Sequence, residues 1–313
     1  MASYGTIFSA ILPVFIVIAV GFLFHRRGWL SEETETGMMK MGMHLLVPCL
    51  VLSLVPGNPA LAKLSSAAWA IGLGCLLVFG GFLIAWLVGL TFGLKVGTGL
   101  RTFIISSGIQ NYGFIALPIV LELFPGNSGP SGLVFIFGIG VELAMWTAGL
   151  AILTGKAGFR ALVNGPFIAV VVALVLNYTG TYRFIPGVVE TSMEMLGRCA
   201  VPMSIFMIGA TMGRFFREGI LIGALRVGFG SVVARIILHA ALVIAAAFLL
   251  PIPEDLGRLL VVQAAMPAAI FPIVLARLFG GQPRVAIQVV LITSLVSLLT
   301  APFVIAWGLA RLG

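Results

Sequence analysis

Long apolar runs without a single charged side chain recur along this sequence and limit what it can fold into. They cover residues 1–24, 64–94, 102–121, 161–182 and 285–310. A helix that crosses a bilayer needs about 20 such residues. A soluble chain of 313 residues, 60% of them hydrophobic and 9% charged, could not bury that much apolar surface. The sequence therefore predicts an all-α integral membrane protein embedded in a lipid bilayer.

Breaks rich in glycine, proline or charge divide the sequence into ten expected membrane helices. Their ranges are 6–25, 37–55, 67–93, 101–124, 131–154, 161–179, 188–213, 219–250, 256–279 and 284–310. The first range has no basic stretch before it and no obvious small-residue cleavage site after it. We therefore interpret it as a retained helix and not as a signal peptide.

Basic residues are divided unequally between the two sides of the predicted bundle. Ten lie in alternate connections, namely Arg26, Arg27, Lys95, Arg101, Lys156, Arg160, Arg214, Arg217, Arg277 and Arg284, and four lie on the opposite side, Lys63, Arg183, Arg258 and Arg311. Because cytoplasmic connections carry the excess of Lys and Arg, both termini are expected outside the cytoplasm. The net charge of +8 thus reflects membrane topology. A nucleic-acid partner would require a clustered basic face.

The two halves of the sequence resemble each other at nearly one offset. Three proline pairs keep their order, Pro13 with Pro166 at 153 residues, and Pro48 with Pro202 and Pro118 with Pro272 at 154. The last pair begins the same tetrapeptide, Pro-Ile-Val-Leu, in both halves. We expect two five-helix repeats, residues 1–155 and 156–313. Because a unit of five helices ends on the opposite face from its start, the second repeat must be inverted.

Inverted repeats are typical of secondary transporters, because exchanging the conformations of the two halves switches the open side. The alternative is that duplication only built a larger helical bundle. In both repeats the fourth helix has the least lipid-compatible sequence, with Gly113 and Pro118 in the first and Pro267 and Pro272 in the second. Glycine and proline disfavour a continuous helix, so both helices are expected to break near mid-membrane.

Freed backbone groups are tolerated only against protein or a water-filled cavity, and matched interruptions in two halves point to a binding site. If the broken helices cross, their exposed amide groups form a site for an anion without any metal. Asn111 and Gln263 are the first candidates for substrate binding, and Gln110 and Tyr112 are weaker ones. The same side chains could instead only satisfy the broken backbone.

Glu142 lies near the middle of the fifth expected helix, where an ionised group is costly. It is the candidate for proton coupling or substrate contact. The alternative is a structural ion pair with Arg235 in the eighth expected helix.

The sequence lacks the parts that several enzyme classes need. Asp255 is its only aspartate, which excludes paired-aspartate sites, and neither an HExxH nor a GxSxG string occurs. We therefore expect no enzyme activity, no cofactor and no metal centre.

One segment has a specific likeness to a known family. Residues 262–272, VQAAMPAAIFP, resemble the VQAAxPxxIxP signature of the auxin efflux carrier family, and Asn111 followed seven residues later by Pro118 is similar to that family's interrupted fourth helix. Pro13, Gly21, Pro48 and Gly209 lie in matching surroundings. The resemblance extends along nearly the whole chain.

The resemblance implies ten helices with a crossed, broken fourth and ninth helix, as in bile-acid symporters and NhaA-like proteins. It also implies a scaffold of helices one, two, six and seven, against which the rest move as an elevator. Substrates of the family are organic anions, indole acetic acid in plants and small carboxylates such as malonate or malate in bacterial relatives. The long cytosolic loop of many plant members is absent here, which favours a bacterial-type carrier in the inner (plasma) membrane.

Several alternatives stay open at this point. Coupling could be to H⁺ through Glu142, to Na⁺, or to the membrane potential alone, and where plant relatives tend to have glutamine this chain has Glu142 before Trp146. A sodium-coupled symporter of the bile-acid type is one alternative, and a non-transporting membrane receptor or channel is another. The sequence does not decide whether the protein forms a homodimer.

Overall fold

The computed structural model describes residues 4–156, 158, 164–216 and 225–312, and within them the fold is helical. The long membrane helices are α1 (Tyr4–Arg26), α4 (Leu64–Thr91), α10 (Gly187–Phe216) and α15 (Pro283–Leu312), with the shorter α9 (Gly165–Thr179). Three further helices are continuous through a π-helical turn: α2 (Glu32–Met41), η1 (Gly42–Leu46) and α3 (Val47–Leu54); α7 (Gly129–Ala144), η4 (Met145–Gly149) and α8 (Leu150–Thr154); and α11 (Leu225–Ser231), η7 (Val232–His239) and α12 (Ala240–Leu249).

Two of the expected helices are each divided into separate half-helices. Range 101–124 becomes α5 (Leu100–Gly108) and α6 (Ala116–Leu123), and range 256–279 becomes α13 (Glu254–Ala265) and α14 (Phe271–Leu278). Short 3₁₀ turns η2 (Pro59–Leu61), η3 (Val96–Thr98) and η6 (Thr181–Phe184) lie in connections. Of expected ranges 161–179 and 219–250, residues 161–163 and 219–224 lie outside the described residues.

Seven helices of the described chain are long and apolar enough to cross a membrane. Their surfaces carry large apolar side chains that water would not accommodate, such as Leu76 at 66% exposed, Leu299 at 67% and Phe303 at 60%. A continuous exposed apolar surface of this kind is favourable only against lipid. The expectation of an all-helical integral membrane protein is confirmed.

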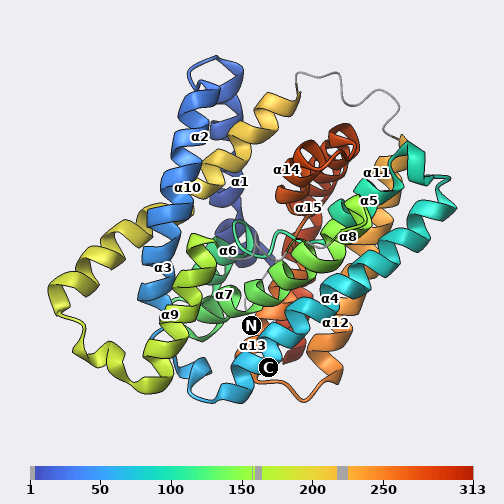
Figure 1. The fold of residues 1–313 in the computed structure, drawn as a ribbon. Coiled ribbons are helices and arrows are strands. Elements are labelled where there is room, and N and C mark those ends of the chain that lie inside the picture. The colour runs from blue at the N-terminus through green and yellow to red at the C-terminus, as the bar shows by residue number, and fades with distance from the viewer. Residues whose placement is uncertain (1–3, 157, 159–163, 217–224, 313) are drawn as a thin grey trace.

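The helices pack in two groups, which Figure 1 shows side by side. The first group, called here the four-helix group, consists of α1, the α2–η1–α3 helix, α9 and α10, which contact one another. The second, called the crossing group, contains α4 to α8 and α11 to α15, packed around the interrupted helices. The groups meet where α1 contacts α6 and α15, α3 contacts α7, and α10 contacts α15.

Glycine allows the closest helix contacts within each group. A Cβ atom at Gly209 of α10 would lie 1.9 Å from the Ile18 carbonyl oxygen of α1, and one at Gly21 of α1 would lie 2.0 Å from the Phe206 oxygen of α10. Small residues let two backbones approach closely, which drives helix association where lipid supplies no hydrophobic effect. The α1–α10 pair is therefore the tightly packed centre of the four-helix group.

A buried carboxylate holds one end of the same group together. Glu35 of α2 is fully buried, and its Oε1 lies 2.5 Å from His25 Nδ1 at the end of α1. Its Oε2 lies 3.3 Å from Arg214 Nη1 near the end of α10. One carboxylate thus links the ends of three helices.

We predict that Gly209→Ala destabilises the protein because the added methyl group cannot fit against the Ile18 carbonyl. Overpacking of this kind lowers the free energy of unfolding by about 1 to 3 kcal/mol, measurable as a lower thermal midpoint in detergent. The matched control is Gly37→Ala in α2, where a Cβ atom meets nothing within 4 Å. An equal midpoint for both variants would contradict the close α1–α10 packing.

Candidate functional site

The two interruptions lie against each other and are joined by backbone hydrogen bonds. Asn111 N donates to the Pro267 carbonyl at 2.8 Å, and Ala269 N donates to the Ile109 carbonyl at 2.9 Å. The pairing forms one antiparallel bridge between Gln110 and Ala268. Because unpaired amides cannot be left in lipid, each interrupted segment supplies the partners that the other needs.

Proline has two different positions in this arrangement. Pro267 lies within the interruption and accepts the bond from Asn111 N. Pro118 and Pro272 lie in the first turns of α6 and α14, where the missing N–H of proline would have no intrahelical partner in any case. These two prolines therefore fit within the first turns of the second half-helices and do not interrupt them. Gly113, just before α6, accepts a bond from Leu117 N at 2.9 Å.

Asn111 and Gln263 both contribute to holding the interruptions. Asn111 Oδ1 accepts from Ile115 N at 3.3 Å, and Gln263 Nε2 donates to the Tyr112 carbonyl at 2.8 Å. In each of these two side-chain amides, one polar atom therefore has a hydrogen bond to the backbone. The Gln263 Oε1 atom is buried and has no hydrogen-bond partner among the described residues.

Gln110 lacks hydrogen-bond partners for both of its polar side-chain atoms, Oε1 and Nε2, among the described residues. The side chain is fully buried. Ser106 and Ser107, at the end of α5, also have buried hydroxyl groups without a partner there. Buried polar groups without partners are rare in folded proteins, and they are expected where a ligand or water completes the site.

Glu142 is connected to the interruption through Tyr112. The Tyr112 hydroxyl donates to Glu142 Oε1 at 3.1 Å, and Asn164 Nδ2 donates to Oε2 at 3.2 Å. Among the described residues no ion pair joins Glu142 to Arg235, so the structural pairing considered as an alternative does not form. The sequence does not reveal that Asn164 binds Glu142, because an asparagine just before a helix gives no sign of a hydrogen bond to a carboxylate on another helix.

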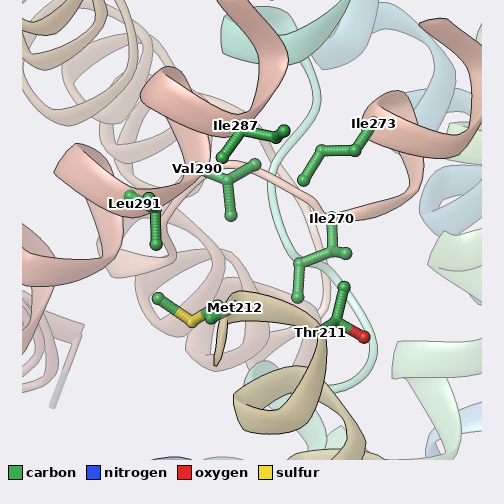
Figure 2. A pocket seen from close by; sticks show the side chains of 7 residues that line it. All are labelled: Thr211, Met212, Ile270, Ile273, Ile287, Val290 and Leu291. Atoms are coloured by element: carbon green, nitrogen blue, oxygen red, sulfur yellow. The ribbon is translucent and has the colours of Figure 1, made fainter. Parts of the chain in front are cut away.

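An apolar contact between the two helix groups lies directly beside the interruption. Ile270, just before α14, lies opposite Thr211 and Met212 of α10, and α15 contributes Ile287, Val290 and Leu291 (Figure 2). The gap between them leaves no room for a water molecule. Among the described residues, no hydrogen bond crosses this contact between the interrupted segment and the four-helix group.

Within the described residues, no group of three or more His, Cys, Asp or Glu side chains could hold a metal ion. The chemistry available at the crossing is hydrogen bonding by amides and hydroxyls beside the beginnings of two half-helices. Neither α6 nor α14 has a side-chain cap at its N-terminus. Such ends carry partial positive charge and bind anions.

Comparison with known proteins gives two findings. A family model described as membrane transport protein matches residues 6–160 and 150–305. A protein of Methanocaldococcus jannaschii named an uncharacterized transporter is 22% identical over 312 residues, which covers 96% of this chain and 97% of that protein.

We predict opposite stability effects for two glutamines at the crossing. Gln110→Leu should leave the free energy of unfolding unchanged or raise it, because it removes a buried amide without partners. Gln263→Leu should lower it by about 1 to 3 kcal/mol, because the Tyr112 carbonyl loses its donor. Thermal unfolding in detergent measures both. Equal losses in the two variants would show that Gln110 has partners in the folded protein.

Proposed function

The chain belongs to the membrane transport protein family, the auxin efflux carrier family that its sequence resembles, and on this premise we propose that it is a secondary transporter of a small organic anion, a carboxylate. The observation that carries the proposal is the crossing itself. Two interrupted helices are hydrogen-bonded to each other, and buried polar atoms beside them have no partner among the described residues.

An anionic substrate matches the polarity of this site. The N-terminal ends of α6 and α14 have no side-chain cap and carry partial positive charge. In the proposed site the carboxylate lies at these ends and accepts hydrogen bonds from Asn111 and Gln110, with Gln263 and Tyr112 beside it. Substrate binding would supply partners for the two polar atoms of Gln110, which have none among the described residues.

The architecture proposed for the carrier is ten transmembrane helices in two inverted five-helix repeats, residues 1–155 and 156–313. Helix contacts support it, because they recur in equivalent pairs. Contact of α1 with α10 corresponds to contact of α9 with α3, and contact of α4 with α7 corresponds to contact of α11 and η7 with α15. The interruptions at 109–115 and 266–270 fall in corresponding helices.

Alternating access is proposed to occur by an elevator-type movement of the crossing group against the four-helix group. The apolar contact of Figure 2 supports this, since sliding it breaks no hydrogen bond or ion pair between Ile270 and Thr211 or Met212. The site would move with the crossing group, because every hydrogen bond described at the interruptions comes from that group.

The orientation and the coupling belong to the same proposal. We propose that the protein lies in the plasma membrane of a bacterium with both termini outside the cytoplasm, and the excess of Arg and Lys in alternate connections supports this orientation. Coupling to H⁺ through Glu142 is favoured, because its carboxylate reaches the interruption through the Tyr112 hydroxyl. Protonation of Glu142 would change a hydrogen bond made by a residue beside the proposed substrate.

We predict saturable uptake of a carboxylate by vesicles that contain the purified protein. The assay loads vesicles with unlabelled malonate, malate or a monocarboxylate and measures counterflow of the labelled compound, with and without Na⁺ and a pH gradient. Asn111→Ala and Gln263→Ala should each weaken binding by about 1 to 3 kcal/mol, the scale of one lost buried hydrogen bond.

Gln282→Ala is the matched control, since this exposed glutamine lies in a connection away from the crossing and should leave binding unchanged. An ohmic current without counterflow for any compound would replace the carrier with a channel. Unchanged affinity in both crossing variants would remove these two residues from the site.

For Glu142 we predict that Glu142→Gln flattens the pH dependence of carboxylate transport, because the variant cannot take up the coupled proton. Transport rates at a series of external pH values measure this. Glu122→Gln, which removes an exposed carboxylate at the end of α6, is the control and should keep the wild-type profile. A wild-type profile in Glu142→Gln would assign Glu142 a structural function only.

A further inference from the structure

Arg235 is a fully buried cation behind the interruption of the second broken helix. It is the largest of the fully buried side chains in the described residues and lies in η7. Its Nε atom donates to the Met266 carbonyl at 2.9 Å, and its Nη2 atom donates to the Gln263 carbonyl at 2.9 Å. Both carbonyls lie at the C-terminal end of α13, where carbonyl groups carry partial negative charge. The Gln263 carbonyl also accepts a bond from Met266 N at 3.2 Å.

The third nitrogen of the guanidinium bonds to a second buried side chain, which packs against α4. Arg235 Nη1 donates to His239 Nδ1 at 2.5 Å, and His239 is itself fully buried. A Cβ atom added at Gly81 would lie 2.6 Å from His239 Cε1 and 2.4 Å from the carbonyl oxygen of Gly108, the last residue of α5. The Arg235–His239 pair therefore extends from the end of α13 to Gly81 of α4, which also packs against the end of α5.

The charge of Arg235 is not neutralised by an acid in the part of the chain that the structure describes. None of the ion pairs there includes Arg235. Glu142, an acid of the crossing group, accepts its bonds from Tyr112 and Asn164. A buried cation at membrane depth is costly unless something compensates it. Here the compensation comes from helix-end carbonyls, and one positive charge remains at the crossing.

We propose that Arg235 is a positioning residue that serves as a fixed cation of the carrier. Its guanidinium holds the C-terminal end of α13 at the crossing, and its charge favours the carboxylate that is proposed to bind at the N-terminal ends of α6 and α14. The effect of Arg235 on the carboxylate rests on the proposed function. Its hydrogen bonds to the end of α13 do not depend on the substrate. A mobile cation would have to enter and leave such a position, whereas Arg235 occupies it permanently.

The test compares Arg235→Ala, Arg235→Lys and Arg235→Met in the full chain, reconstituted in nanodiscs, with radiolabelled malate as the binding probe. Arg235→Ala and Arg235→Met should raise Kd by about 10- to 100-fold, the scale for hydrogen bonds of a charged group. Arg235→Lys retains the charge and should lose less than either. Methylguanidinium should restore binding to Arg235→Ala, while tetramethylammonium at equal ionic strength should not.

The matched control is Arg226→Ala, because Arg226 is an exposed arginine of the neighbouring α11 and its loss removes the same formal charge. It should bind malate as the wild type does. Wild-type affinity in Arg235→Ala, or equal losses in the Lys and Met variants, would overturn the proposal. If Arg235→Ala does not fold, the comparison of the Lys and Met variants decides.

A second measurement separates this inference from the proposed function. If the wild type binds none of the carboxylates, the substrate assignment fails, and hydrogen exchange of the amides of residues 266 and 268–270 then tests Arg235 by itself. Exchange should be faster in Arg235→Met than in the wild type and in Arg226→Ala, and methylguanidinium should slow it in Arg235→Ala. Unchanged exchange in the Met variant would show that Arg235 does not hold the interruption.

Discussion

The rest of this structure depends on one constraint, which is that polypeptide amides inside a membrane must find partners within the protein. An interrupted helix leaves such groups without partners, and one interruption alone would be unstable. Here the segment around Asn111 and the segment around Pro267 satisfy each other through two backbone hydrogen bonds. The crossing is therefore a property of the pair, and neither segment could be broken in this way without the other.

The side chains around the crossing are used in two different ways. Asn111, Gln263 and Arg235 have hydrogen bonds to backbone groups of the interruptions, so they stabilise the broken conformation. Gln110 has no hydrogen bond from either polar atom within the described residues. Stability alone does not explain a buried amide without partners, because an apolar side chain of similar size would cost less. That difference makes Gln110 a stronger candidate for substrate contact than its residue type suggested.

The contacts within the four-helix group differ in kind from the contact between the two groups near Ile270. In the four-helix group, glycine brings α1 and α10 into backbone contact, and Glu35 links the ends of three helices. The contact between the groups near Ile270 is apolar and dry. Among the described residues no directional bond crosses this contact, although the Asn164–Glu142 hydrogen bond joins α7 to the start of α9 elsewhere. The contact near Ile270 is thus consistent with two bodies that can change their relative position, which the proposed mechanism requires.

The sequence by itself determined the membrane class, the approximate helix boundaries and the places of the two interruptions, because hydropathy and the positions of glycine and proline act locally along the chain. It also suggested Asn111, Gln263, Gln110 and Tyr112, since polar residues are scarce in apolar segments. Only the tertiary structure decided which of them have partners, because a hydrogen bond such as that from Gln263 to Tyr112 joins residues 151 positions apart. For the same reason the sequence could not place Arg235: its charge suggested a pairing with Glu142, whereas the folded chain directs it to the carbonyl groups at the end of α13.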